Sequence, residues 1–161
     1  MMNPPPPPGN AGIAILLVDD DPDCRLMVRD ALEIGQIRNP VYEVDSGTAA
    51  LEFLEHSEQD PTRVRPGLIY LDLEMPGLDG LETLRLLRVQ PGLADVSIVM
   101  LTGVADDGAK RRALQLGANS FANKPTEARQ FAQTVLAATH YWTRIHQRPA
   151  RVAQSANSQL R

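Results

Sequence analysis

The 161-residue chain has a single cysteine, Cys24, and few aromatic residues, which make up 4% of the sequence. One thiol excludes both a disulfide framework and a cysteine-rich zinc site. No apolar run approaches the roughly 20 residues that span a bilayer, and Met1–Asn3 lead into prolines instead of an apolar signal segment. We therefore predict a single-domain, soluble, cytoplasmic protein with no membrane insertion.

Positive charge is scarce in the body of the chain. Residues 19–143 contain all 20 acidic residues and 12 of the 16 basic ones, whereas the chain from Arg144 onward contains four arginines and no acid. An acidic body repels the phosphate backbone, so this charge distribution argues against nucleic acid as a main partner.

The two ends differ in composition from the middle. Residues 1–12 contain the run Pro4–Pro8 and cannot form a core, so we predict a disordered leader that is solubilising rather than a proline-motif ligand. Residues 147–161 are predicted to be a disordered basic tail, either solvated or weakly anion-binding. The folded domain is predicted to span residues 13–146.

Short aliphatic runs alternate with stretches of helical periodicity. The predicted strands are residues 13–18, 41–44, 68–71, 97–101 and 119–123. The predicted helices begin at Pro22, after a cap at Ser46, at Gly80, near residue 105 and near Thr126. The last of them is predicted to continue to Ile145. This alternation predicts an α/β fold, a doubly wound five-stranded parallel sheet with helices on both faces. Right-handed crossovers place the carboxyl ends of all strands at one edge, where such sheets bind ligands.

Polar residues follow four of the predicted strands. Asp19-Asp20-Asp21 follows the first, Asp72 and then Glu74 follow the third, Thr102 ends the fourth and Lys124 follows the fifth. Each feature alone has a simpler explanation, such as a helix cap or a turn. Their joint occurrence at matching strand ends is much more specific and predicts one shared site.

Clustered carboxylates must take up protons or hold a cation, because like charges about 4 Å apart repel by roughly 4 kcal/mol at an effective dielectric of 20. Oxygen ligands favour Mg²⁺, and no histidine lies near these strand ends, which argues against zinc. With a divalent ion present, one carboxylate can act as a nucleophile toward a phosphoryl group while a lysine neutralises charge.

Four segments resemble the motifs of the response-regulator receiver domain, of the CheY-like superfamily. They are Leu-Leu-Val-Asp-Asp-Asp-Pro (16–22), Leu-Asp-Leu-Glu-Met-Pro-Gly-Leu-Asp-Gly (71–80), Leu-Thr-Gly (101–103) and Leu-Gly-Ala-Asn-Ser-Phe-Ala-Asn-Lys-Pro (116–125). The resemblance covers about residues 13–142. It implies the flavodoxin-like strand order 2-1-3-4-5 and a role in two-component phosphorelay signal transduction.

The resemblance also implies a role for each matching residue. Asp72 would accept a phosphoryl group from a histidine kinase or a histidine phosphotransfer protein and become 4-aspartylphosphate. Asp19, Asp20 and Asp72 would bind Mg²⁺, for which Mn²⁺ can substitute, with Asp20 a more direct ligand than Asp19. The backbone carbonyl of Glu74 would complete the metal shell.

Three further positions match the part of the family motif that responds to phosphorylation. Thr102 matches the switch hydroxyl, Lys124 the lysine that pairs with the phosphoryl group, and Phe121 the aromatic switch. Glu74 and Val104 match the positions that tune loss of the phosphoryl group. Because Glu74 adds negative charge and Val104 offers no hydrogen bond to water, we predict slow dephosphorylation.

No output-domain pattern follows the last predicted helix, so the sequence indicates a stand-alone receiver that signals by protein contact. The segment from Asn119 to Trp142 loosely resembles receivers that serve phytochrome-type kinases, some of which form homodimers through the fourth helix, fifth strand and fifth helix. The downstream partner is not identified by the sequence. The exposed residues of the first helix, among Cys24, Met27 and Val28, cannot be assigned from spacing alone.

Three alternatives remain open from the residues alone. A haloacid-dehalogenase-like phosphatase also uses a strand-end aspartate, but it requires Thr or Val where this chain has Asp23. A receiver-shaped binding module that works without phosphorylation would not need the intact acceptor site. A Rossmann nucleotide site is disfavoured because aspartates, rather than Gly-x-Gly-x-x-Gly, follow the first strand. We predict a phosphoacceptor with weak self-phosphatase activity at most, not an enzyme.

Overall fold

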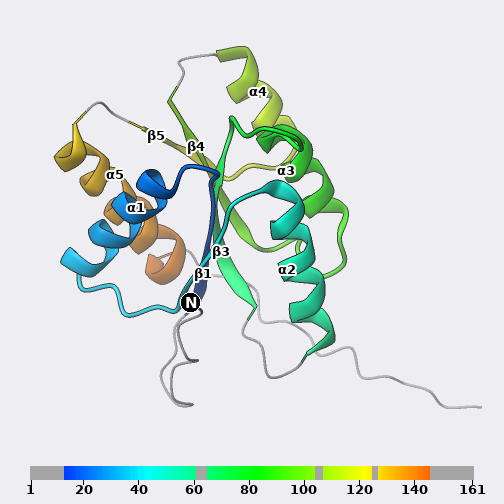
Figure 1. Ribbon diagram of the computed structural model, residues 1–161, viewed down its shortest axis with the longest axis horizontal. Helices are drawn as coiled ribbons and strands as arrows, with labels where there is room; N and C mark the ends of the chain where they lie inside the picture. The colour runs from blue at the N-terminus through cyan, green and yellow to red at the C-terminus, as the bar shows by residue number, and fades with distance from the viewer. Residues whose placement is uncertain (1–12, 61–64, 104–106, 125–126, 146–161) are drawn as a thin grey trace, which may run out of the picture.

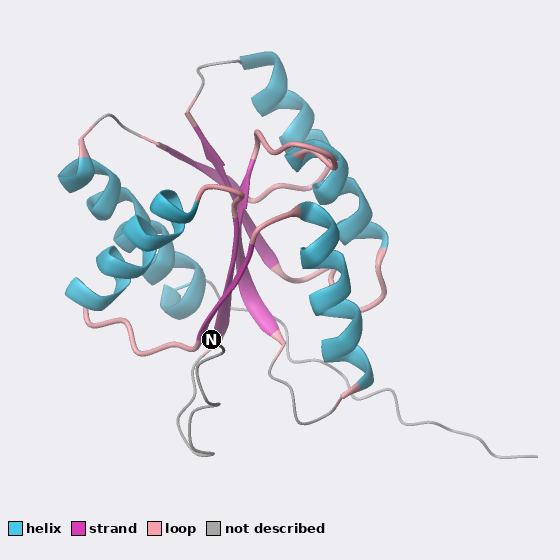
Figure 2. Ribbon diagram, viewed as in Figure 1, coloured by secondary structure: helices cyan, strands magenta, loops and turns pink. Residues whose placement is uncertain are grey.

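The computed structural model describes residues 13–60, 65–103, 107–124 and 127–145. Strands and helices alternate along it (Figures 1 and 2). The strands are β1 (Ala14–Val18), β2 (Val41–Val44), β3 (Pro66–Asp72), β4 (Ser97–Thr102) and β5 (Ser120–Asn123). The helices are α1 (Pro22–Ile34), α2 (Gly47–Gln59), α3 (Gly80–Val89), α4 (Asp107–Gln115) and α5 (Ala128–His140), followed by a π-helical turn, η1 (Tyr141–Ile145).

The predictions for the leader (1–12) and the tail (147–161) concern residues outside the described ranges and stay predictions. The same holds for Val104 and for the expected helix start near Thr126. Within the described ranges, no helix combines the length and apolar character needed to cross a membrane.

The five strands form one parallel sheet in the order β2-β1-β3-β4-β5, which confirms the predicted fold class and strand order. Helices α1 and α5 cover one face, and α2, α3 and α4 cover the other (Figure 1). The strand order reverses at β1, so the ends of β1 and β3 lie side by side at the edge that binds ligands in sheets of this kind.

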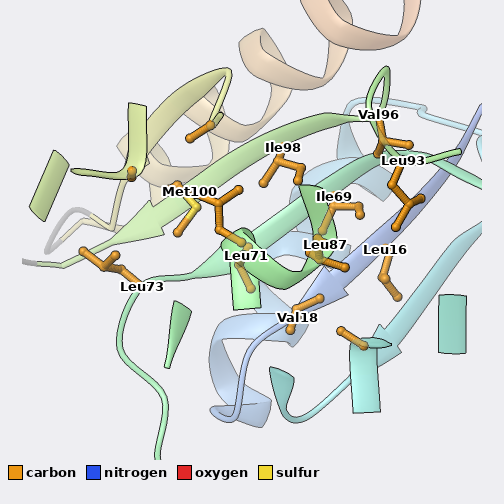
Figure 3. Close-up of a cluster of buried hydrophobic side chains, with 14 of the residues drawn as sticks. Leu16, Val18, Ile69, Leu71, Leu73, Leu87, Leu93, Val96, Ile98 and Met100 are labelled. Carbon is orange, nitrogen blue, oxygen red and sulfur yellow. The ribbon is translucent and has the colours of Figure 1, made fainter. Parts of the chain in front are cut away.

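Successive residues of the central strands point to opposite faces of the sheet, and both sets are buried. One core lies under α2, α3 and α4 (Figure 3), and its strand residues are Leu16, Val18, Ile69, Leu71, Ile98 and Met100. The other lies under α1 and α5 and includes Ile15, Leu17, Leu68, Tyr70, Val99 and Leu101. This double burial fixes the register of the strands whose ends carry the polar residues.

Local caps start the helices where the sequence predicts them. The carboxylate of Asp21 accepts a hydrogen bond from the N–H of Asp23 at 2.9 Å, and Ser46 Oγ accepts one from Ala49 at 3.0 Å. Asp79 caps α3 in the same way, accepting from the N–H of Glu82 at 2.8 Å, a cap that the sequence analysis missed. Each cap satisfies a backbone donor that the helix leaves unpaired.

The last helix differs from the prediction of one regular helix to Ile145. The α-helix ends at His140 and continues as the π-helical turn. Thr143 Oγ1 donates to the carbonyl of Thr139 at 2.6 Å, and such back-bonding by threonine bends helices. Trp142 nevertheless stays inside, where its Nε1–H donates to Ser120 Oγ at 3.1 Å.

Arg88, near the end of α3, joins the loops at the edge of the sheet opposite the polar strand ends. Its guanidinium donates to the carbonyls of Leu93 (2.8 Å), Val96 (2.7 Å) and Gly117 (2.8 and 3.0 Å) and to Asn119 Oδ1 (2.8 Å). These bonds tie the start of β4 and the approach to β5 to one helix.

Gly80 allows α3 to begin close to the end of β3. Its N–H donates to the carbonyl of Leu73 at 3.1 Å. A Cβ at this position would lie 2.3 Å from the carbonyl oxygen of Asp72 and 2.6 Å from Leu73 Cα. Since both neighbours are backbone atoms, a side chain here would displace the segment that carries Asp72.

We predict that Gly80→Ala destabilises the protein by about 1–3 kcal/mol, because the steric strain exceeds the roughly 1 kcal/mol that alanine gains over glycine in a helix. Urea unfolding at equilibrium measures the change. Gly103→Ala is the control, since no atom lies within 4 Å of a Cβ built at Gly103. Equal stability of Gly80→Ala and the wild type would contradict this account of the β3–α3 junction.

Candidate functional site

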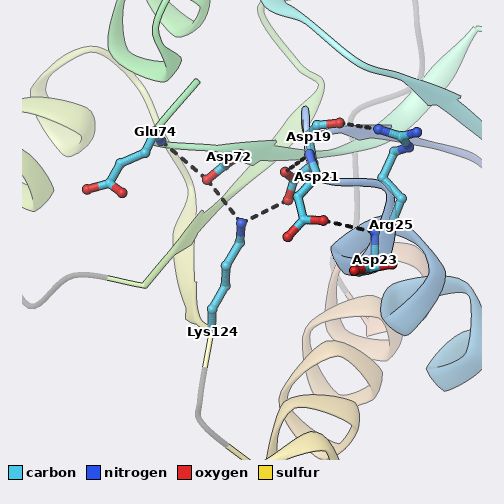
Figure 4. A network of polar contacts seen from close by, with 7 residues as sticks. All are labelled: Asp19, Asp21, Asp23, Arg25, Asp72, Glu74 and Lys124. Carbon is cyan, nitrogen blue, oxygen red and sulfur yellow. Dashed lines mark hydrogen bonds and ion pairs between the residues drawn. The ribbon is translucent and has the colours of Figure 1, made fainter. Parts of the chain in front are cut away.

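The carboxyl ends of β1, β3 and β5 bring together the central polar residues predicted from the sequence (Figure 4). Asp19 follows β1, Asp72 ends β3 and Lys124 follows β5. Asp19 and Asp72 are almost fully buried, with 1% and 4% of their surface exposed. Segments more than 50 residues apart in sequence therefore share one site, as the parallel sheet requires.

Three carboxylates form the acidic cluster of this site. One oxygen from each of Asp19, Asp20 and Asp72 lies within 4.8 Å of the other two, with Asp20 exposed to solvent. At such separations, each pair of charges repels by a few kcal/mol at an effective dielectric of about 20. The cluster thus needs a counter-charge.

Lys124 supplies part of that counter-charge. Its Nζ lies 2.9 Å from Asp19 Oδ2 and 3.2 Å from Asp72 Oδ1 (Figure 4). Burial by itself would lower the pKa of Lys124, but the hydrogen bond and charge of Asp19, with smaller contributions that include Asp72, raise it above its usual value. The lysine therefore stays protonated and bridges the two buried carboxylates.

The two buried carboxylates titrate differently because their neighbours differ. Burial, followed by the charge of Asp19, raises the pKa of Asp72 to about 6, although Lys124 opposes the shift. Burial would also raise the pKa of Asp19, but hydrogen bonds from Cys24, Lys124 and the N–H of Asp21 lower it overall. Asp72 is thus the carboxylate whose ionisation is the less favourable, and a cation beside it would stabilise its charged form.

Cys24 is a neighbour of the cluster that the sequence analysis placed only on a helix. Its side chain hydrogen-bonds to Asp19, and burial, followed by Asp19, raises the pKa of the thiol to about 12. The thiol therefore stays protonated and stabilises the Asp19 carboxylate. Cys24 and Val28 are buried, whereas Leu26 and Met27 are 56% and 38% exposed, which settles which residues of α1 face solvent.

Glu74 and Thr102 adjoin the cluster through their backbones. The N–H of Glu74 donates to Asp72 Oδ1 at 3.2 Å, while its side chain is exposed. Thr102 is buried at the end of β4, and its carbonyl accepts a hydrogen bond from the N–H of Lys124 at 2.7 Å. The structure thus places Glu74 beside Asp72 and Thr102 beside Lys124, while the predicted roles of the Glu74 carbonyl and the Thr102 hydroxyl stay predictions.

Phe121 lies in β5, partly buried, and packs against the core under α2, α3 and α4. It is three residues from Lys124 in the same chain segment. Val104, which was predicted together with Glu74 to tune loss of the phosphoryl group, lies outside the described residues.

Arg25 is a second residue that the sequence analysis missed. Its Nη1 donates to the main-chain carbonyl of Asp19 at 2.6 Å, and its Nε lies 3.4 Å from Glu43 Oε1. No local pattern signals this contact, because Arg25 lies one helical turn beyond the acidic motif and its other partner lies on β2.

The donor set fits a hard divalent cation. Within the described residues, the only group of three potential ligands is the carboxylate cluster, with no histidine or cysteine among its members. Carboxylate oxygens with one exposed side, open to water, suit Mg²⁺ or Mn²⁺ better than zinc.

Comparison with known proteins relates the chain to a family. The model of the response regulator receiver domain matches residues 15–136. The chain is 34% identical over 119 residues to the cyclic di-GMP phosphodiesterase response regulator RpfG of Xanthomonas campestris, covering 74% of this chain and 30% of that protein. The chain spans no more than about a third of the first curated relatives that it matches.

Other relatives match over nearly their whole length. Response regulator Rcp1 of Synechocystis is 27% identical over 136 residues, covering 84% of this chain and 92% of that protein. The Mn²⁺-bound form of Rcp1 superimposes with a TM-score of 0.76, covering 86% of this chain and 99% of that one, at 27% identity. The phosphorylated cyanobacterial phytochrome response regulator RcpA superimposes with a TM-score of 0.79, covering 87% and 100%, at 26% identity.

The match spans all five strands, apart from Ala14 at the start of β1, and reaches into the last helix, α5, so it includes every strand end that delivers a residue to the acidic cluster. The chain therefore belongs to the receiver domain family of two-component response regulators.

Proposed function

We propose that Asp72 accepts a phosphoryl group from a histidine kinase or a histidine phosphotransfer protein. The observation that carries this proposal is the meeting of Asp72 with Asp19, Asp20 and Lys124 at one sheet edge. A carboxylate oxygen of Asp72 attacks the phosphorus of phosphohistidine in line, the P–N bond breaks, and the imidazole nitrogen leaves with its electron pair and takes up a proton. The product is 4-aspartylphosphate.

We assign the cation ligands to Asp19, Asp20, Asp72 and the backbone carbonyl of Glu74. Mg²⁺, or Mn²⁺ in its place, neutralises charge on the transferring oxygens when it is bound. Two observations support the assignment: the three carboxylates converge, and the N–H of Glu74 already bonds to Asp72. Asp20 is exposed and therefore binds the ion from the solvent side.

Lys124 and Thr102 hold the new phosphoryl oxygens in this proposal. Lys124 bridges Asp19 and Asp72 before transfer, so its ammonium is already beside the accepting carboxylate. Inward movement of the Thr102 hydroxyl would vacate space into which Phe121 rotates, repacking the surface of α4 and β5 between two conformations. The partly buried position of Phe121 against the core supports such a change.

The receiver family implies a histidine kinase partner in general, and we propose that signalling beyond it occurs by protein contact. A homodimer through α4, β5 and α5 is supported by Leu114 of α4, which is 52% exposed, and by Tyr141, which directly follows α5 and is 46% exposed. We propose a cytoplasmic location and at most weak self-phosphatase activity, with the folded receiver spanning residues 13–146.

We predict that Asp72→Asn abolishes labelling by a small phosphoryl donor such as phosphoramidate, because the amide is not a nucleophile. Asp19→Asn or Asp20→Asn should shift the Mg²⁺ dependence of labelling to about tenfold higher concentration, since each replaces a charged carboxylate by a neutral amide, which attracts the cation less. Intact-mass spectrometry measures the phosphorylated fraction. Asp79→Asn, which keeps the cap of α3, is the control and should label like the wild type. Labelling of Asp72→Asn at the wild-type rate would refute the assignment.

We predict opposite effects of the two buried carboxylates on stability in metal-free buffer. Because the pKa of Asp72 rises from 3.8 to about 6 on folding, its contribution to stability is present below pH 4 and is lost as the pH rises through 6. Asp72→Asn should therefore stabilise the protein by about 1–3 kcal/mol at pH 7.5. The difference should vanish near pH 4.

Asp19→Asn is the matched comparison and should destabilise the protein at pH 7.5, because the pKa of Asp19 is lowered in the folded state. Its stabilising contribution is lost as the pH falls through that lowered pKa. Urea unfolding with EDTA between about pH 3 and 7.5 measures both variants, because the lowered pKa of Asp19 lies below pH 4. A loss of stability in Asp72→Asn at pH 7.5 would contradict the charge balance described for the site.

We predict slow loss of the phosphoryl group and a several-fold change in its rate on replacing Glu74 or Val104. Glu74→Asn removes a negative charge beside the acceptor, and Val104→Glu adds a side chain that can hydrogen-bond an attacking water. A radiolabel chase measures the decay, with Glu82→Gln, on the exposed face of α3, as the control. Decay that is unchanged in both variants would count against tuning by these positions.

A further inference from the structure

Arg25 links the acidic cluster to the neighbouring strand. Its guanidinium donates through Nη1 to the main-chain carbonyl of Asp19 at 2.6 Å (Figure 4), and its Nε faces Glu43 on β2 at 3.4 Å. The side chain of Arg25 is only 19% exposed, and that of Glu43 27%. One planar cation therefore ties the carbonyl that follows β1 to the edge strand β2.

With the contact from Arg25, every polar group of Asp19 has a hydrogen-bond partner. The N–H of Asp19 donates to the carbonyl of Val44 at 3.3 Å, and its Oδ1 accepts from the N–H of Asp21 at 3.0 Å. Its Oδ2 accepts from Lys124 at 2.9 Å. The carbonyl oxygen, held by Arg25, is the remaining polar group of this residue.

Fixing the carbonyl of Asp19 also fixes the start of Asp20. The peptide group between the two residues is planar, so the direction of the Asp19 carbonyl sets the direction of the Asp20 N–H and restricts where its side chain can point. Asp20 is exposed, in contrast to Asp19 and Asp72. Its carboxylate therefore depends on the backbone, more than on surrounding side chains, for its place in the cluster.

We propose that Arg25 is a positioning residue for the cation site, holding the Asp19–Asp20 peptide so that the carboxylate of Asp20 faces those of Asp19 and Asp72. This inference rests on the proposed function, in which these three carboxylates bind the divalent ion. Glu43 supports the role by holding the Nε side of the guanidinium, and it shares its other carboxylate oxygen with Arg29.

Arg25 can influence cation binding in two ways, and the two have opposite signs. As a positive charge beside the cluster it repels a divalent ion, so removing it should tighten binding, by no more than about fivefold in physiological salt. As a positioning group it orders a ligand, and loss of such outer contacts weakens metal affinity by about 10–100-fold. Because the loss of positioning is the larger of the two effects, we expect that removing the Arg25 guanidinium weakens cation binding.

The test is the affinity of the full-length protein for Mn²⁺, measured from the EPR signal of the free ion. Arg25→Met, which keeps the length of the side chain and removes its charge and donors, should bind Mn²⁺ about tenfold more weakly than the wild type. Arg29→Met is the matched control, since Arg29 contacts Glu43 but not Asp19, and it should bind within about twofold of the wild type. Urea midpoints of both variants establish that they are folded.

Unchanged or tighter Mn²⁺ binding by folded Arg25→Met would overturn the positioning role while leaving the proposed cation site intact. Absence of Mn²⁺ binding by the wild type would instead overturn the proposed function and this inference with it. If Arg25→Met does not fold, the Mn²⁺ affinity of Arg25→Lys tests the proposal instead. It keeps the charge but cannot hold Asp19 and Glu43 together in a planar fork, so weaker binding supports the proposal and unchanged binding contradicts it.

Discussion

The site depends on the repulsion among carboxylates that the fold forces together. The parallel sheet brings Asp19 and Asp72 into a buried position at adjacent strand ends, with Asp20 beside them at the surface. Lys124 offsets part of this repulsion but leaves the pKa of Asp72 at about 6. A divalent cation would supply the positive charge that the cluster still needs, both before phosphorylation and after a phosphoryl group had added further negative charge.

The rest of the fold holds the strand ends in this arrangement. Residues of the central strands are buried on both faces, so a shift of register would cost both cores at once. Gly80 lets α3 begin against the backbone of Asp72, and Arg88 anchors the far end of the same helix to the loops before β4 and β5. Asp72, the proposed acceptor, therefore lies at the end of a strand that is packed on both faces, with Arg25 and Cys24 supporting its neighbour Asp19 from α1.

The sequence predicted what depends on local patterns and on the general geometry of parallel sheets. Ser46 was recognisable as a helix cap, and the strand end that carries Asp72 followed from an aliphatic run that stops at a polar residue. Four motifs in the correct order then implied the family, which the family model and the fold confirm.

Contacts between distant segments could not be predicted in this way. Arg25 reaches the backbone of Asp19, and Arg88 reaches five carbonyl and amide oxygens in two loops; neither has a spacing signature. The hydrogen bond between Cys24 and Asp19 requires the packed orientation of α1, and the Trp142–Ser120 hydrogen bond joins the π-helical turn after His140 to β5, which is distant in sequence.

The central claim, phosphorylation of Asp72, is tested most directly by borohydride trapping after incubation with phosphoramidate, followed by tandem mass spectrometry. The account predicts homoserine at position 72 with Mg²⁺ and none with EDTA; trapping at another carboxylate, or equal trapping with EDTA, would contradict it.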